Sequence, residues 1–264
     1  MINVIILFFE HFLKFAFIVF ISYVLALINT SQKAIEIEQM PDKEESAFSL
    51  FIFFIVASIL FFLLLKYVKL FFLLNIAELM LLFFSSYVIS FILLHNLVLS
   101  ITFSLFLTIL RTLNKFSTNI TATINSIGGA IIIGSFLPLF PLIIFSLLLI
   151  VYDVFSVFIS KHMIEMANIA KKYQTAMLIE SKREYEERGK KHVQSIIIGT
   201  GDIVLPSSIV IASIPFDIHF TMFLSSLIGY WLVVASLFIL KRPLPALPFI
   251  LFPQLLTIFL LSTF

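Results

Sequence analysis

The chain of 264 residues is too apolar for a soluble globular protein. Hydrophobic residues make up 61% of its positions, charged residues only 12%, and its mean hydropathy is +1.15. Soluble domains are about one-quarter charged, so polar surface is too scarce here to cover a globule in water. The small net charge of +2 gives no reason to expect a nucleic-acid partner, and the lack of cysteine excludes disulfides, thiolate metal sites and a cysteine nucleophile. We therefore expect one membrane domain over residues 1–264, with the lipid bilayer as its solvent.

Apolar runs between polar breaks predict an all-α polytopic protein with about nine transmembrane helices. A span needs about 20 apolar residues, and suitable runs lie at 2–28, 48–66, 69–94, 96–113, 117–137, 139–160, 194–214, 218–240 and 244–262. The first run lacks a basic segment before it and is too long for a signal peptide, so we interpret it as a retained span. Short breaks at His95 and between Pro138 and Pro141 leave eight spans as an alternative.

Basic residues fall on one side of a nine-span layout. The second, fourth, sixth and eighth connections hold 14 of them, whereas the other side holds only Lys33 and Lys43 in an acidic loop at 29–47. Cytoplasmic loops carry the excess of Lys and Arg. The pattern predicts a cytoplasmic amino terminus, an outside carboxyl terminus, six spans in 1–160 and three in 194–264.

The long hydrophilic connection at 161–193 is expected on the cytoplasmic side. Its charges of both signs from Ile164 to Glu187 are typical of a solvated helix. A solvent-exposed helical linker is the simpler interpretation. A role in admitting or gripping a substrate is the alternative.

Acidic residues inside apolar spans are the candidates for chemistry, since an intramembrane charge is costly. They are Glu10, Glu78, Asp153 and Asp202. Glu10 lies near a span end and can reach toward water. Glu78 has no charged counterpart that the sequence places opposite it, so we expect an interhelical hydrogen bond there and leave its role open.

Asp153 and Asp202 are predicted to share one depth. Asp153 lies eight residues before Lys161 in the sixth run, and Asp202 lies ten residues after His192 in the seventh. At about 1.5 Å per residue both sit roughly 12–15 Å from the cytoplasmic face. Two neighbouring carboxyls share a proton, so one accepts a proton from water while the other donates to an amide oxygen. This pair is the predicted catalytic dyad.

The residues around the aspartates add weaker signals. Gly199, Thr200 and Gly201 precede Asp202, where glycines allow close backbone approach, although glycine in lipid more often marks helix packing. The prolines at 243, 245 and 248 predict irregular backbone at membrane depth, which is tolerated where it lines a cavity. A proline-rich helix start is the alternative.

Taken together, these motifs resemble the presenilin and signal peptide peptidase family of intramembrane aspartyl proteases. Tyr-Asp falls in the sixth span, Gly-x-Gly-Asp in the seventh and Pro-Ala-Leu opens the ninth, while residues 199–206 are similar to archaeal presenilin-type members. The resemblance implies a presenilin-like fold in which Asp153 and Asp202 hydrolyse a peptide bond within a membrane-spanning substrate helix. It implies substrate-binding positions at Tyr152, Gly199, Thr200, Gly201, Pro245, Ala246 and Leu247.

The resemblance also carries expectations about partners. It implies no metal or other cofactor and no obligate accessory subunit, and a substrate that unwinds locally and pairs as a strand near the dyad. The basic loop at 161–193 gives the presenilin orientation, so we expect substrates with an outside amino terminus. Thr200 departs from the larger apolar residue common in the family, which predicts a shifted cleavage preference.

Two other classes remain open from the residues. Paired intramembrane carboxylates also serve proton or cation channels and transporters, although no internal repeat supports a transporter. A catalytically idle assembly partner or chaperone is the third. The chain has no His-Glu-x-x-His or Gly-x-Ser-x-Gly motif, and its five histidines, scattered toward span ends, suit interfacial positions.

Overall fold

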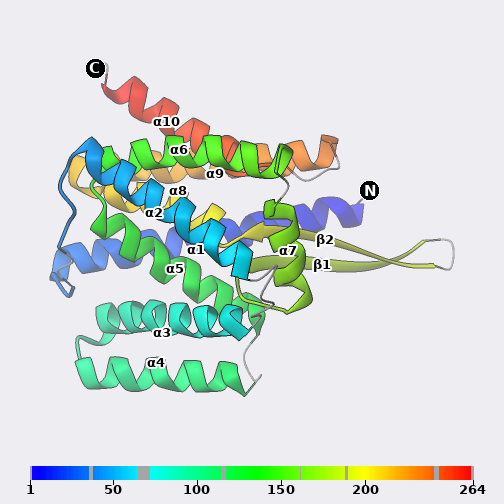
Figure 1. Cartoon of the computed structure of the whole chain (residues 1–264), viewed down its shortest axis with the longest axis horizontal. Helices are drawn as coiled ribbons and strands as arrows, with labels where there is room; N and C mark the ends of the chain where they lie inside the picture. The colour runs from blue at the N-terminus through cyan, green and yellow to red at the C-terminus, as the bar shows by residue number, and fades with distance from the viewer. Residues whose placement is uncertain are drawn as a thin grey trace.

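Helices that run back and forth between two ends of a bundle build most of this protein (Figure 1). The computed structural model describes residues 2–35, 38–64, 72–113, 117–160, 162–187, 190–240 and 244–262. Its first six helices are α1 (Ile2–Gln32), α2 (Glu44–Leu63), α3 (Phe72–Leu94), α4 (Leu97–Thr112), α5 (Thr118–Phe136) and α6 (Leu139–Phe158). They are followed by α7 (His162–Lys172), β1 (Leu178–Glu187), β2 (Lys190–Gly199), α8 (Gly201–Ala212), a 3-10 turn (Ile214–Phe216), α9 (His219–Leu240) and α10 (Leu247–Ser262).

The apolar helices follow the predicted spans in chain order. Within the described residues, α1, α3, α5, α6 and α9 are each long and apolar enough to cross a membrane. The shorter apolar helices α4, α8 and α10 and the 20-residue α2 occupy the other predicted positions. Large apolar side chains such as Phe53, Ile239 and Phe259 point out of the bundle, as expected for a surface that faces lipid. The chain is therefore a multi-pass membrane protein, and the count of nine crossings stays a prediction.

The connection at 161–193 differs from the helical linker that the charges predicted. Helix α7 ends at Lys172, and the chain then forms an antiparallel hairpin whose register pairs Leu178 with Gly199 and Glu187 with Lys190. Three consecutive isoleucines, Ile196 to Ile198, favour a strand because β-branched side chains pack well on a pleated surface. The predicted helix from Ile164 to Glu187 is thus wrong beyond α7. The predicted span at 194–214 is wrong in its first turn and a half, which belongs to β2.

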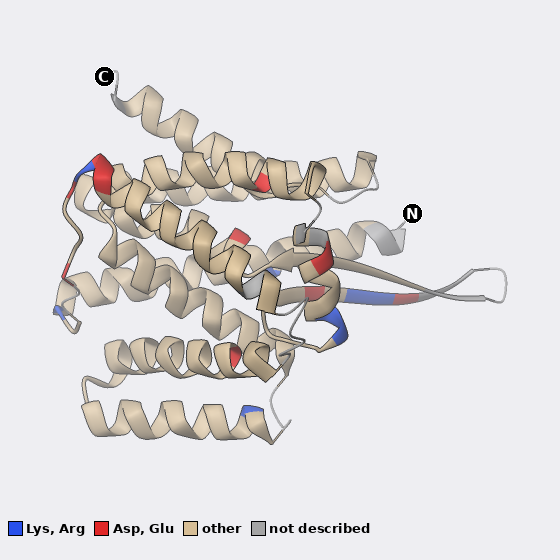
Figure 2. Ribbon diagram, viewed as in Figure 1, with Lys and Arg blue, Asp and Glu red and all other residues tan. Residues whose placement is uncertain are grey.

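The two ends of the bundle carry different elements. The amino terminus, α7 and the hairpin lie at one end, and the carboxyl terminus lies at the other (Figure 1). Charged residues occur on α7, on the hairpin and in the loop before α2 (Figure 2). This layout matches the predicted alternation of spans, while the cytoplasmic identity of the hairpin end stays a prediction. Several residues of the charge argument lie outside the described residues, namely Lys66, Lys69, Lys115, Lys161, Arg188, Lys241 and Arg242.

Small residues let the central helices approach closely. Helix α5 contacts α3 at Gly128, where an added Cβ would overlap the backbone of Ser85. It contacts α8 at Gly134, where a Cβ would lie 2.7 Å from the Cβ of Ile211. Helix association in lipid depends on such close packing because the bilayer supplies no hydrophobic drive between helices. Helix α8 is consequently held in the centre, with its first turn at the hairpin end.

Candidate functional site

Asp153 and Asp202 line a single cavity at the hairpin end of the bundle. The cavity measures about 480 Å³, and its walls come from α1, α6, α7, α8, α9, the hairpin and the segment before α10. Most of the wall is apolar, including Ile196 to Ile198 of β2 and Val233 of α9. The topology therefore brings together two carboxyls that are 49 positions apart in the sequence.

Asp153 projects from the last part of α6 and is held by the start of α10. Its side chain is buried, and its Oδ2 accepts a hydrogen bond of 3.2 Å from the Leu247 backbone N–H. The Ala246 backbone amide contributes a second bond to the same carboxyl. The first N–H groups of a helix have no partner within it, and the helix dipole favours an anion there. Within Pro-Ala-Leu, the backbone N–H groups of Ala246 and Leu247 are thus the donors to the Asp153 carboxyl.

The backbone around Pro245 is irregular, as its prolines predicted. Residues 244–246 have no helical structure, and α10 begins at Leu247. Leu244 and Ala246 line the cavity, whereas Leu247 reaches the site through its backbone. Pro243 lies outside the described residues.

Asp202 occupies the first turn of α8, directly after the hairpin. The Gly199 backbone gives its carboxyl a hydrogen bond, and Asp153 is near enough to act on it electrostatically. A Cβ at Gly199 would lie 3.2 Å from Asp202 Oδ2, so this glycine makes room for the carboxyl. Pro206 lacks an N–H, which leaves the Asp202 carbonyl without its usual helical donor. The aspartate consequently sits at a junction of strand and helix rather than inside a long span.

The other predicted substrate positions divide into two groups. Gly199, Thr200 and Gly201 line the cavity together with Asp202, and Gly201 has open space where a Cβ would be. Tyr152 points to α2 instead, where its hydroxyl lies 3.0 Å from Ser58 Oγ and its ring meets Phe54 edge-on. Tyr152 and Pro245 are not among the described residues that line this cavity.

Two polar residues of the cavity wall were missed by sequence reasoning. His11 of α1 was interpreted as interfacial, yet it is 1% exposed and lies 2.9 Å from Ser181 Oγ through its Nδ1. Tyr230 of α9 is equally buried, stacks on Phe15 at 4.0 Å and lies within electrostatic reach of Asp202. A polar group within a mostly apolar helix was the signal that each of them gave.

Glu78 has the charged partner that the sequence did not supply. Arg111 Nε lies 2.6 Å from Glu78 Oε1, and this ion pair joins α3 to α4 away from the aspartates. The expected interhelical hydrogen bond at Glu78 is thus present, and its donor is a charged residue that the sequence did not place opposite it. Among the described residues, no group of three His, Asp or Glu side chains is arranged to hold a metal ion.

Comparisons with known proteins agree with this architecture. The family described as "Signal-peptide peptidase, presenilin aspartyl protease" matches residues 15–261. Two crystal structures of a presenilin family intramembrane aspartate protease, in space groups C222 and P2, are similar in fold. The first has a TM-score of 0.60 at 20% identity and covers 93% of this chain and 92% of its own. The second has a TM-score of 0.60 at 21% identity, with coverage of 92% and 93%. Comparison with curated proteins gave no match.

Proposed function

This chain belongs to the signal-peptide peptidase and presenilin aspartyl protease family, and from that premise we propose that Asp153 and Asp202 together hydrolyse peptide bonds within membrane-spanning substrates. The observation that carries the proposal is their shared cavity. Each carboxyl receives backbone hydrogen bonds, Asp153 from Leu247 and Asp202 from Gly199. Such fixed donors hold a side chain in position before the substrate arrives.

The proposed reaction needs one water and one proton shared by the two aspartates. The ionised carboxyl takes a proton from water, whose oxygen attacks the peptide carbonyl carbon, while the protonated carboxyl donates to the carbonyl oxygen. The resulting gem-diol intermediate then collapses: the C–N bond breaks, the amine leaves with the proton of the protonated carboxyl, and one hydroxyl of the intermediate returns its proton to the ionised carboxyl. The two carboxyls finish the cycle with the one shared proton that they held at its start.

The cavity also indicates the kind of substrate. Its apolar walls suit a peptide from a transmembrane helix, and Gly201 leaves room for a substrate backbone beside Asp202. An intact helix hides its peptide groups, so the substrate must unwind locally before its carbonyl reaches the dyad. We propose substrates whose amino terminus lies outside, because the basic residues of 161–193 favour a cytoplasmic hairpin. We also propose that the chain acts without an accessory subunit.

Reconstitution into liposomes tests this function. The purified protein is mixed with a tagged single-span substrate, and the products are mapped by mass spectrometry. The proposal expects cleavage within the apolar segment without any added protein. Cleavage confined to the flanking soluble regions would contradict it. Proton or cation flux without cleavage would favour the channel alternative.

A further inference from the structure

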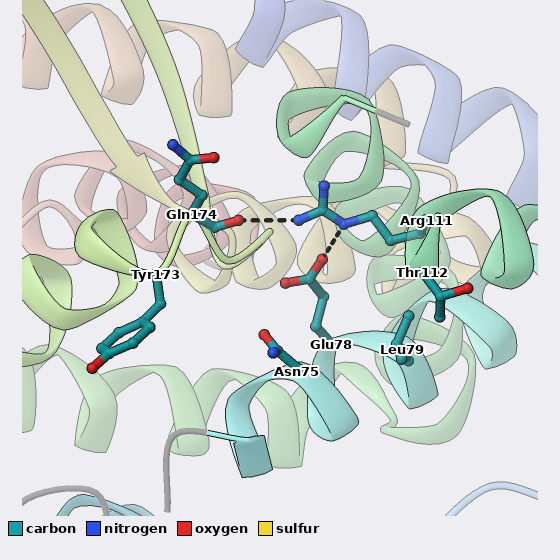
Figure 3. A pocket seen from close by; sticks show the side chains of 7 residues that line it. All are labelled: Asn75, Glu78, Leu79, Arg111, Thr112, Tyr173 and Gln174. Atoms are coloured by element: carbon teal, nitrogen blue, oxygen red, sulfur yellow. Dashed lines mark hydrogen bonds and ion pairs between the residues drawn. The ribbon is translucent and has the colours of Figure 1, made fainter. Parts of the chain in front are cut away.

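The buried ion pair of Glu78 and Arg111 lies outside the cavity of the aspartates. The side chains are 4% and 13% exposed, and they border a separate cavity of about 380 Å³ at the hairpin end of α3 and α4 (Figure 3). Replacing a buried ion pair by apolar residues often leaves stability unchanged or raises it, so stability alone does not explain such a pair. Its other contacts indicate what it does.

Both partners also bond the loop between α7 and β1. Glu78 uses Oε2 to accept a hydrogen bond of 2.8 Å from the Ala176 N–H. Arg111 donates from Nη2 to the Gln174 carbonyl at 3.0 Å (Figure 3). Hydrogen bonds with an ionised partner are about twice as strong as neutral ones. The ion pair therefore holds two backbone groups of this loop by hydrogen bonds, the Gln174 carbonyl and the Ala176 N–H.

The loop held in this way has a conformation that needs support. Gln174 has a φ of 50°, in the left-handed region that residues other than glycine rarely adopt. Thr175 and Ala176, which follow, are 2% and 1% exposed. Such strain persists only where the surroundings hold it. The bond from Arg111 acts on the strained residue itself.

From this loop, a short path of backbone bonds leads to Asp202. Met177 follows Ala176, and its carbonyl accepts a hydrogen bond of 3.0 Å from the Thr200 N–H. Leu178 pairs with Gly199, the residue whose backbone bonds the Asp202 carboxyl. A shift of the loop at Ala176 is thus passed to the strand end beside Asp202.

Asn119 of α5 anchors the same strand further along. Its side-chain amide accepts from the Glu180 N–H at 3.0 Å and donates to the Glu180 carbonyl at 2.8 Å, as a neighbouring strand would. The outer edge of β1 is occupied at this point. The base of the hairpin is accordingly fixed by polar side chains of the bundle.

We propose that Glu78 and Arg111 are positioning residues of the proposed protease. Their ion pair holds residues 174–176 by hydrogen bonds and thereby determines the position of the hairpin base and of Asp202. The inference rests on the proposed function for its effect on cleavage. Its structural part, the coupling of the loop to residues 196–200, holds independently of which residues perform the chemistry.

Three variants separate positioning from folding. Glu78→Ala removes the acceptor of the Ala176 N–H and leaves Arg111 without this carboxylate. Glu78→Gln retains an acceptor for the Ala176 N–H. The double variant Glu78→Leu/Arg111→Leu removes both buried charges, so it is expected to remain folded although the hydrogen bonds to the loop are lost. Asn75→Ala is the matched control, because Asn75 borders the same cavity and no bond from it to residues 174–176 occurs among the described residues.

Hydrogen exchange measured by mass spectrometry tests the coupling between the loop at 174–176 and residues 196–200, and it does not depend on cleavage activity. In the double variant we expect faster exchange both at 174–180 and at 196–200, with a thermal unfolding temperature at or above that of the parent protein. Exchange that rises at 174–180 but stays at the parent level at 196–200 would overturn the proposal. Asn75→Ala is expected to exchange like the parent.

Cleavage kinetics in liposomes provide the second readout. We expect a fall in kcat of about 10-fold or more in the double variant with little change in KM, because displacing a catalytic group by about 1 Å costs up to 100-fold. The ratio of cleavage products should shift, since Ile196 to Ile198 line the cavity, and Glu78→Gln should recover part of the rate. If the parent protein cleaves and the double variant has the same kcat and product ratio, the positioning role is refuted while the proposed protease function stands. If the aspartates prove dispensable, the exchange experiment still decides the structural part.

Discussion

Gly229 of α9 tests the close packing that holds α10 beside the site. A Cβ at this position would lie 2.7 Å from Ile250 Cα and closer still to the Ile250 carbonyl oxygen. These are backbone atoms of α10, so no side-chain rotation relieves the overlap, and Gly229→Ala must push the two helices apart. Forcing an extra methyl group into a packed interior costs about 1–3 kcal/mol.

The expected loss is measurable as a shift in thermal unfolding. For a chain of this size each kcal/mol lowers the midpoint by roughly 2–4 °C, so Gly229→Ala should unfold about 2–12 °C below the parent protein in the same detergent and at one scan rate. Gly129→Ala is the matched control, because its Cβ meets only the Val204 side chain at an ordinary 3.5 Å. An unfolding midpoint of Gly229→Ala equal to those of the parent and the control would refute the packing argument.

Three further substitutions probe the site and the hairpin. Gly201→Ala meets no atom within 4 Å, so its unfolding midpoint should equal that of the parent, whereas its cleavage rate should fall because the methyl group enters the cavity; an unchanged rate would place the substrate elsewhere. Gly199→Ala should displace the Asp202 carboxyl by a few tenths of an ångström and slow cleavage severalfold, measured as initial rate beside the unfolding midpoint. Asn119→Ala removes the two hydrogen bonds that Asn119 makes with the Glu180 backbone, so amide exchange of that strand should rise about 5-fold for each kcal/mol of lost protection; exchange at the parent rate would count against the anchor.

The membrane class and the neighbourhood of the aspartates were predictable from the sequence. A carboxyl inside an apolar run is costly enough to be noticed, and alternating basic connections placed Asp153 and Asp202 at the same end of adjacent spans. The prolines around Ala246 predicted irregular backbone because each ring removes a donor. These signals are local, so they survive without knowledge of the packing.

The hairpin was not predictable by the same reasoning. Mixed charges from Lys182 to Glu187 fit the face of a solvated helix as well as a strand. The strand is stabilised by tertiary contacts. Asn119 of α5 bonds the Glu180 backbone, and Lys14 of α1 donates to the Glu180 carbonyl and to Ser181 Oγ. Nothing in the run itself indicates those anchors.

The partner of Glu78 was hidden for a related reason. Arg111 lies at the end of α4, 33 positions away, and was counted among the basic residues of a connection. Only the folding of α4 against α3 turns that charge inward. The inward direction of His11 and Tyr230 likewise depends on the rotation of each helix about its axis, which apolar runs without a clear polar face do not specify.

The most direct measurement compares cleavage of one single-span substrate in liposomes by the parent protein, Asp153→Asn and Asp202→Asn. Asparagine retains the shape of the side chain and an oxygen that can accept the bonds from Leu247 or Gly199, but it cannot ionise. Asp217→Asn is the control, because Asp217 is almost fully exposed in the turn before α9 and asparagine tolerates its φ of 59°. We expect each of the first two variants to lose at least about 100-fold in rate, with unchanged unfolding midpoints, while Asp217→Asn cleaves like the parent. Cleavage at the parent rate by either Asp153→Asn or Asp202→Asn would contradict the dyad.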